Sequence, residues 1–361
     1  MRILLSDTLE DYLQEMIQSI DFSSLNTFLN EHLRTKMDME ELIARVSMDG
    51  IGALSGENIS MLVFDTFLYE LSVARPIFIK MLLFSTLFSV FHRLLATKNK
   101  YISDIGFLMI YATMMILLMQ SFFLVKDIAV EGMNAMTGFL NALIPTYAGV
   151  LVFSGNAVTG AFFYEIAFGV IYLLESMIRT FLIPVIHIFV LVLFMNQLFD
   201  EDKLSKLADL MEKIVKIFLK AAFGGVVGMG VIQSLLAPAK DRVAGNMILQ
   251  GMSAIPGVGN TLGATGEIIL SCGTLIKNSV GVVALVFLVF VAVIPMIKIG
   301  CFWLMYHMLS AILQPIADKR VAECVSAVAR GCDLYLKIIL YSMMLFFILI
   351  AMVGAATSFM Q

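Results

Sequence analysis

Long apolar runs dominate this sequence and restrict its fold more than any other feature. A helix that crosses a membrane needs about 20 largely apolar residues, and the chain contains several windows of this kind. They are residues 76–95, 105–125, 157–178, 181–199, 216–236, 268–290, 291–313 and 334–357. The composition agrees, because 60% of the residues are hydrophobic and 14% are charged, whereas about a quarter of a soluble domain is charged. We therefore predict an all-α polytopic membrane protein with about eight transmembrane helices.

The first 70 residues differ from the rest of the chain. They carry 13 acidic and 4 basic side chains, whereas the remainder carries 15 and 20. Their apolar residues recur at steps of three and four, which is the period of one helical face: Leu9, Leu13, Met16, Ile17 and Ile20. We predict a small acidic, helical, soluble region over residues 1–70 and a transmembrane domain over 71–361. The acidic surface fits either a solvated face or a docking platform for a basic partner.

A glycine-rich segment, residues 251–280, separates two apolar runs. Proline ends or kinks a helix, and glycine permits sharp turns and close approach of the backbone. Non-helical backbone at membrane depth must be satisfied by protein or by a water-filled cavity, so we predict a re-entrant segment over 251–266 that lines a polar path. Its candidate lining residues are Pro256, Gly257, Gly259, Asn260, Gly263, Gly266, Glu267, Lys277 and Asn278. The alternative is an ordinary solvent loop.

The second half of the chain contains an apparent internal repeat. Ile144-Pro145 and Ile255-Pro256 are 111 residues apart, and so are Ile183-Pro184 and Ile294-Pro295. These pairs define copies over 134–236 and 245–358, each beginning with a Pro/Gly-broken segment (134–153 in the first copy) that we expect to re-enter. With three spans in each copy the two would have opposite orientations, which is the inverted-repeat plan of many secondary transporters.

His187 and Lys298 occupy matching positions in the two copies, three residues after the proline. Ionisable groups inside spans usually face a cavity or a partner, so both are further candidates for lining the path. Two structural explanations remain open, namely contact with carbonyl groups freed by the proline and snorkelling of Lys298 to an interface. Glu175 and Arg179 are four residues apart, a spacing that favours an ion pair on one helix.

Catalytic chemistry finds no support in the sequence. The four cysteines, at positions 272, 301, 324 and 332, lack the paired spacing of metal sites, and CxxC, HExxH, GxxxxGK[ST] and GxSxG are all absent. We expect no enzymatic activity, no catalytic residue, no cofactor, no bound metal and no nucleic-acid partner. The lipid bilayer is the expected surroundings.

Three segments resemble the stage III sporulation protein AE family of endospore-forming Firmicutes. They are residues 233–246 (QSLLAPAKDRVAGN), residues 255–260 (IPGVGN) with the following Gly263, Gly266 and Glu267, and residues 309–320 (LSAILQPIADKR). The resemblance implies a polytopic component, in the mother-cell membrane around the forespore, of the channel complex that links the two cells. It implies as partners the stage III sporulation proteins AA (an ATPase), AB, AC, AD, AF, AG and AH, and stage II sporulation protein Q of the forespore.

The function expected from this resemblance is that of a membrane core of the sporulation channel or secretion complex, required for spore development. Two alternatives stay open. One is a stand-alone secondary transporter, suggested by the inverted repeat. The other is an assembly scaffold without a pore, for which the acidic region would matter most.

Overall fold

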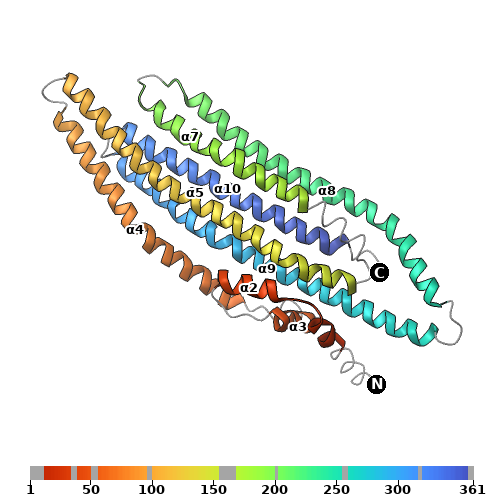
Figure 1. Cartoon of the computed structure of the whole chain (residues 1–361). Helices are drawn as coiled ribbons and strands as arrows, with labels where there is room; N and C mark the ends of the chain where they lie inside the picture. Colours follow the sequence, from red (N-terminus) through yellow and green to blue (C-terminus); the bar gives the residue numbers. More distant parts are fainter. Residues whose placement is uncertain are drawn as a thin grey trace.

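The chain folds into an elongated bundle of long helices (Figure 1). The computed structural model describes residues 12–33, 39–49, 56–95, 100–153, 168–199, 202–253, 259–315 and 319–356, and their regular structure is helical throughout. The predicted all-α class is thereby confirmed. The helices are α2 (Ser23–Leu33), α3 (Met39–Asp49), α4 (Gly56–Leu95), α5 (Lys100–Phe153), the π-helix η2 (Ile178–Leu182), α7 (Ile183–Asn196), α8 (Ser205–Ser253), α9 (Gly259–Leu313) and α10 (Lys319–Ala356). Residues 12–18 and 168–177 are also helical.

Several of these helices are much longer than a bilayer is thick. α5 has 54 residues and α9 has 55, and at 1.5 Å per residue each is about 80 Å long, against a hydrocarbon core of about 30 Å. Five helices of the described part are long and apolar enough to cross a membrane: Tyr111–Tyr147, Phe168–Asn196, Ser205–Val231, Thr274–Leu313 and Lys319–Met352. The protein is therefore a multi-pass membrane protein, and the candidate spans of the described part are longer than the windows that we predicted; the total of about eight spans stays a prediction.

Proline does not divide these helices as the sequence suggested. α5 continues through Pro145 to Phe153, so the break predicted within residues 134–153 is wrong. The predicted spans 268–290 and 291–313 form one helix, because α9 continues through Pro295. A proline removes one backbone hydrogen bond, and long apolar helices packed against neighbours tolerate this loss.

The described residues include only part of the predicted re-entrant segment 251–266. Residues 251–253 end α8 and residues 259–266 begin α9, whereas Pro256 and Gly257 lie outside the described residues. Re-entry of this segment stays a prediction.

A π-helix joins the predicted spans 157–178 and 181–199 into one. Helix 168–177 runs without interruption into η2 and α7, and the amide of Ile183 bonds to the carbonyl of Ile178, five residues earlier. A proline ring collides with the carbonyl four residues before it in a regular α-helix, and for Pro184 that carbonyl belongs to residue 180, inside the widened turn. The π-helix therefore explains how the helix passes Pro184 without ending.

The directions of the helices follow from contacts along their length. Along α5, Tyr111, Phe122 and Thr137 contact Phe194, His187 and Arg179 in turn, so helix 168–196 is antiparallel to α5. α9 is antiparallel to α5 as well, because Ser121 bonds to Tyr306 while Gly132 faces Pro295. These directions agree with Figure 1, where α5 and α9 run side by side in opposite senses.

The two copies of the predicted repeat run in the same direction. Helix 168–196 corresponds to α9, and both are antiparallel to α5. α8 corresponds to α10, and these two are parallel, because Asp209, Phe223 and Gly230 meet Arg330, Tyr341 and Met352 in the same order. The inverted orientation is therefore wrong. Each copy contributes two long helices rather than three spans, and an even number of crossings preserves direction. The repeat itself stays a prediction.

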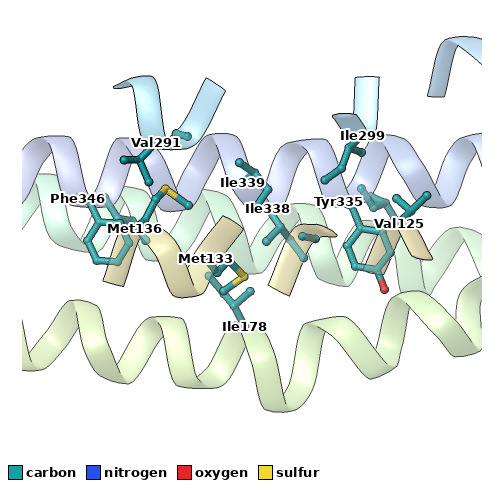
Figure 2. Close-up of a cluster of buried hydrophobic side chains, with 14 of the residues drawn as sticks. Val125, Met133, Met136, Ile178, Val291, Ile299, Tyr335, Ile338, Ile339 and Phe346 are labelled. Atoms are coloured by element: carbon teal, nitrogen blue, oxygen red, sulfur yellow. The ribbon is translucent and has the colours of Figure 1, made fainter. Parts of the chain in front are cut away.

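The hydrophobic core lies where α5, α9, α10 and helix 168–196 meet. Figure 2 shows Met133 of α5 next to Ile178 of η2, with side chains of α9 and α10 above them. The residues drawn include Val125, Met136, Val291, Ile299, Tyr335, Ile338, Ile339 and Phe346, all of them buried.

The amino-terminal helices belong to the same core. The Phe28 ring of α2 packs 5.9 Å from the Phe139 ring of α5, and Thr146 Oγ1 of α5 donates a hydrogen bond of 2.9 Å to the carbonyl of Asp21. α3 packs on α9. The predicted boundary between residues 70 and 71 falls inside α4, and the placement of residues 1–70 in solvent stays a prediction.

Candidate functional site: the cavity between α5 and α9

A cavity of about 530 Å³ opens between α5 and α9, next to α2. We call it the α5–α9 cavity. It lies close to the middle of two candidate membrane spans, Tyr111–Tyr147 and Thr274–Leu313. Its lining residues are Phe28 from α2, Ile128, Glu131, Gly132, Asn134, Ala135 and Gly138 from α5, and Val291, Ile294, Pro295 and Lys298 from α9.

Two glycines of α5 shape the cavity. A Cβ atom at Gly132 would lie 2.7 Å from two ring carbons of Pro295, and a Cβ atom at Gly138 would lie 3.0 Å from the Phe28 ring. Real Cβ atoms almost never lie as close to a neighbour as the 2.7 Å found for Gly132. The 3.0 Å found for Gly138 is also tighter than most real Cβ contacts. The missing side chains therefore let α9 and α2 approach α5 closely on either side of the hollow.

Three polar side chains line the cavity among apolar neighbours. Lys298 carries an ammonium group, and its Nζ atom lies 3.7 Å from a carboxylate oxygen of Glu70 on α4. Glu131 and Asn134 add a carboxylate and an amide from α5. Charged groups at this depth of a membrane protein usually face a cavity or a partner. The combination of one cation, one anion, one amide and an apolar wall suits a polar or amphipathic solute.

Lys298, a residue predicted from the sequence, therefore lines this cavity. Its matching residue His187 lies on another side of α5, packed between Phe122 and Phe123 at ring distances of 5.4 and 5.1 Å. His187 Nδ1 lies 3.0 Å from the carbonyl of Ile183 and 3.4 Å from Tyr335 Oη. The carbonyl that Pro184 would leave free belongs to residue 180, so this contact with Ile183 does not decide between the explanations offered for His187.

The remaining predicted residues do not converge on the cavity. Lys277 is fully buried and Asn278 is exposed; Lys277 lies 21 residues from Lys298 along α9, or about 32 Å. Gly259, Asn260, Gly263, Gly266 and Glu267 lie in the first turns of α9, farther away still. Their role in lining a path stays a prediction.

Sequence reasoning missed Glu131, Asn134, Gly132 and Glu70 as members of the site. Glu131 had a readable signal, because it follows Lys126 and Asp127 in the middle of an otherwise apolar stretch. Gly132 and Glu70 had none, since their importance comes from contacts with α9, far away in sequence.

Candidate metal ligands do not cluster in the described part of the chain. No group of three or more His, Cys, Asp or Glu side chains there is arranged to hold a metal ion. Cys301, Cys324 and Cys332 are buried with free thiols. The Cys324 sulfur lies 2.9 Å from Tyr111 Oη, and that hydroxyl also donates a hydrogen bond of 2.7 Å to the carbonyl of Phe194. These contacts hold α5, α7 and α10 together, which is a structural role.

Fold and site together define a multi-pass helical membrane protein with a largely apolar cavity that holds a few polar side chains near the middle of its spans. Comparison with known proteins gives the family. The family model of stage III sporulation protein AE matches residues 37–357, so the chain belongs to that family, as the resemblance in sequence indicated. It is 25% identical over 301 residues to stage III sporulation protein AE of Bacillus subtilis (strain 168), an alignment that covers 80% of this chain and 74% of that protein. No solved structure is similar to the chain.

Proposed function

We propose that this protein is a membrane core component of the complex that links mother cell and forespore, in the mother-cell membrane around the forespore, and that its activity is not enzymatic. The observation that carries the proposal is the α5–α9 cavity, which holds Lys298, Glu131 and Asn134 near the middle of two long apolar helices. Family membership supplies the process, sporulation at stage III.

The proposed task of the cavity is to conduct or gate a polar solute. A cavity with mixed charges and one apolar wall lowers the cost of moving a polar group through the hydrocarbon layer, because its own polar groups replace part of the water. The stage III sporulation proteins AA to AD and AF to AH, and stage II sporulation protein Q, are the proposed partners in assembly.

Filling the cavity tests this proposal. The change Asn134→Trp places a large side chain at the wall of the cavity, whereas Ile116→Trp alters an exposed position of the same helix that does not line the cavity. We expect the Asn134 variant to lose spore formation at an unchanged protein level and the Ile116 variant to sporulate normally. Normal sporulation of both variants, at wild-type levels of membrane-inserted protein, would exclude a role of the cavity.

A non-conducting scaffold is the second candidate. The observation that favours it is the docking of the amino-terminal helices on the bundle, which leaves Glu15 of helix 12–18 and Glu31 of α2 exposed. Reversing both charges to lysine should then abolish co-purification of partner proteins while the Asn134 variant stays active. Retained co-purification after the charge reversal, together with an inactive Asn134 variant, would favour the conducting role.

The stand-alone transporter becomes the weakest alternative. It was suggested by inverted repeats, and the helices that the repeat equates run parallel. Ion-dependent uptake by proteoliposomes that contain this protein alone would favour the stand-alone transporter again.

A further inference from the structure

A second polar group lies inside the bundle, away from the α5–α9 cavity. Glu175, on helix 168–177, is 2% exposed. Within the part of the chain that the structure describes, neither of its carboxyl oxygens has a hydrogen-bond partner. It belongs to the candidate span Phe168–Asn196. A buried carboxyl group without a partner is rare and calls for an explanation.

Arg179 is the obvious partner, and it is turned elsewhere. In a regular α-helix residues four apart face each other, but the π-helix η2 begins at Ile178, between these two residues. The Arg179 guanidinium donates a hydrogen bond of 3.1 Å to Thr137 Oγ1 of α5, and among the described residues it makes no hydrogen bond to either carboxyl oxygen of Glu175. The predicted Glu175–Arg179 pair is therefore wrong, and the π-helix is the reason.

The other polar group near Glu175 comes from α10. Ser342 is fully buried, and its hydroxyl has no hydrogen-bond partner among the described residues. It interacts electrostatically with Glu175, as Arg179 does. On α10 it follows Ile338 by one turn and precedes Phe346 by one turn, and these two residues belong to the apolar cluster that also contains Ile178 (Figure 2). The surroundings of Glu175 are thus apolar except for one hydroxyl and one guanidinium, which is bonded to Thr137 through one terminal nitrogen while its buried Nε atom has no hydrogen-bond partner among the described residues.

An ionised carboxylate in such surroundings would carry a large desolvation cost, which the nearby Ser342 hydroxyl and Arg179 guanidinium offset only in part. The protonated acid avoids most of this cost, and its O–H group gives Ser342 a partner across the helix interface. We propose that Glu175 is a proton-binding site in the interior of the bundle, holding one proton in this conformation, with Ser342 and Arg179 as the groups that face it. Binding of the proton converts the carboxylate to the neutral acid and removes one negative charge from the membrane interior. The proposal is independent of the α5–α9 cavity.

Dicyclohexylcarbodiimide tests this assignment on the full chain in lipid nanodiscs. This apolar reagent reacts with protonated carboxyl groups: the acid proton moves to a carbodiimide nitrogen, and the carboxyl oxygen bonds to the central carbon. We expect peptide mass spectrometry to find the adduct on Glu175, with a yield that falls as the pH is raised, and to find none at this position in Glu175→Gln.

Glu212 is the matched control within the same protein. It lies in the candidate span Ser205–Val231 and its side chain is 17% exposed, but it forms ion pairs with Lys216 and Arg330. It should stay unmodified. Absence of the adduct from Glu175 in the wild type, or equal modification of Glu175 and Glu212, would overturn the proposal. An adduct that forms on Glu175 after Arg179→Met and not in the wild type would show that Arg179 keeps the carboxylate ionised.

Thermal unfolding gives an independent measurement. Glutamine has the shape of a protonated glutamate, so Glu175→Gln should leave the Tm in detergent unchanged near neutral pH. A markedly lower Tm would show that a negative charge is required at this position and would contradict the proposal.

Discussion

The contact between Gly132 and Pro295 gives the sharpest stability prediction. A Cβ atom at Gly132 would lie 2.7 Å from two carbons of the proline ring and 3.3 Å from Ile339 Cδ1, whereas ordinary contacts begin at 3.4 Å. The proline ring is fixed to the backbone and cannot rotate away. Gly132→Ala must therefore push α9 away from α5 by about 0.7 Å at this point.

The magnitude follows from two opposing terms. Alanine is favoured over glycine in a helix by about 1 kcal/mol, which stabilises the variant. Forcing one methyl group into a packed interface costs about 1–3 kcal/mol, and a gap of 0.5–1 Å removes about a quarter to a half of the dispersion energy of the neighbouring contacts. Because both α9 and α10 crowd this position, we expect the upper part of that range and a net loss of about 1–2 kcal/mol.

Gly300→Ala is the matched control, since a Cβ atom there would have no neighbour within 4 Å. It should increase stability by up to about 1 kcal/mol. The measurement is unfolding by SDS in mixed micelles, followed by the fluorescence of Trp303, which is the single tryptophan of the chain. Equal or greater stability of Gly132→Ala than of the wild type would refute the close approach of α5 and α9.

Three further changes probe other contacts. Arg330→Met removes ion pairs from α10 to Asp209 and Glu212 of α8 and should lower the free energy of unfolding by about 1 kcal/mol in the same titration. Phe28→Ala should release α2 from α5, lower stability by about 1–2 kcal/mol and speed limited proteolysis of the amino-terminal helices. Hydrogen bonds from the Asn196 amide and from Ser205 hold the pKa of Asp202 below its ordinary value. At a pH above its unfolded pKa, this carboxyl group therefore stabilises the fold. That contribution is lost as the pH falls through its folded pKa. Acidification should therefore destabilise the wild type more than Asp202→Asn in thermal scans.

The class of fold was predictable because it depends on a property that local sequence determines. A window of about 20 largely apolar residues favours a membrane-spanning helix, and α5, helix 168–196, α9 and α10 all contain long apolar windows. Whether a proline ends a helix depends instead on its neighbours in space. Pro184 is accommodated by the π-helix before it, and the ring of Pro295 packs against Gly132, where a side chain would collide with it.

The candidate site was predictable to a smaller extent for the same reason. Lys298 was identified because a charge inside a span is visible in the sequence. Glu70 and Asn134 became part of the site through the packing of α4 and α5 against α9. The spacing of Glu175 and Arg179 predicted a pair, yet one widened helical turn was enough to separate them.

The parallel arrangement of α8 and α10 leads to a prediction about membrane orientation. The start of α8 lies at the same end of the bundle as the start of α10 and the end of α9, and the carboxyl-terminal end of α10 lies at the other end (Figure 1). The first of these ends carries Lys203, Lys206, Lys319 and Arg320, so the bias of basic residues toward the cytoplasm places it there. The eight-span prediction, in contrast, places the α7–α8 connection outside, together with the carboxyl terminus.

Labelling of two positions distinguishes these arrangements. A cysteine at Lys203, in a chain without its four native cysteines, should react with a membrane-impermeant thiol reagent only after the cells are opened. A protease-sensitive tag fused after residue 361 should be removed from intact protoplasts, because α8, α9 and α10 separate the two positions by three crossings. Access to both from the same side would require an even number of crossings, and the continuity of α9 through Pro295 would then be wrong.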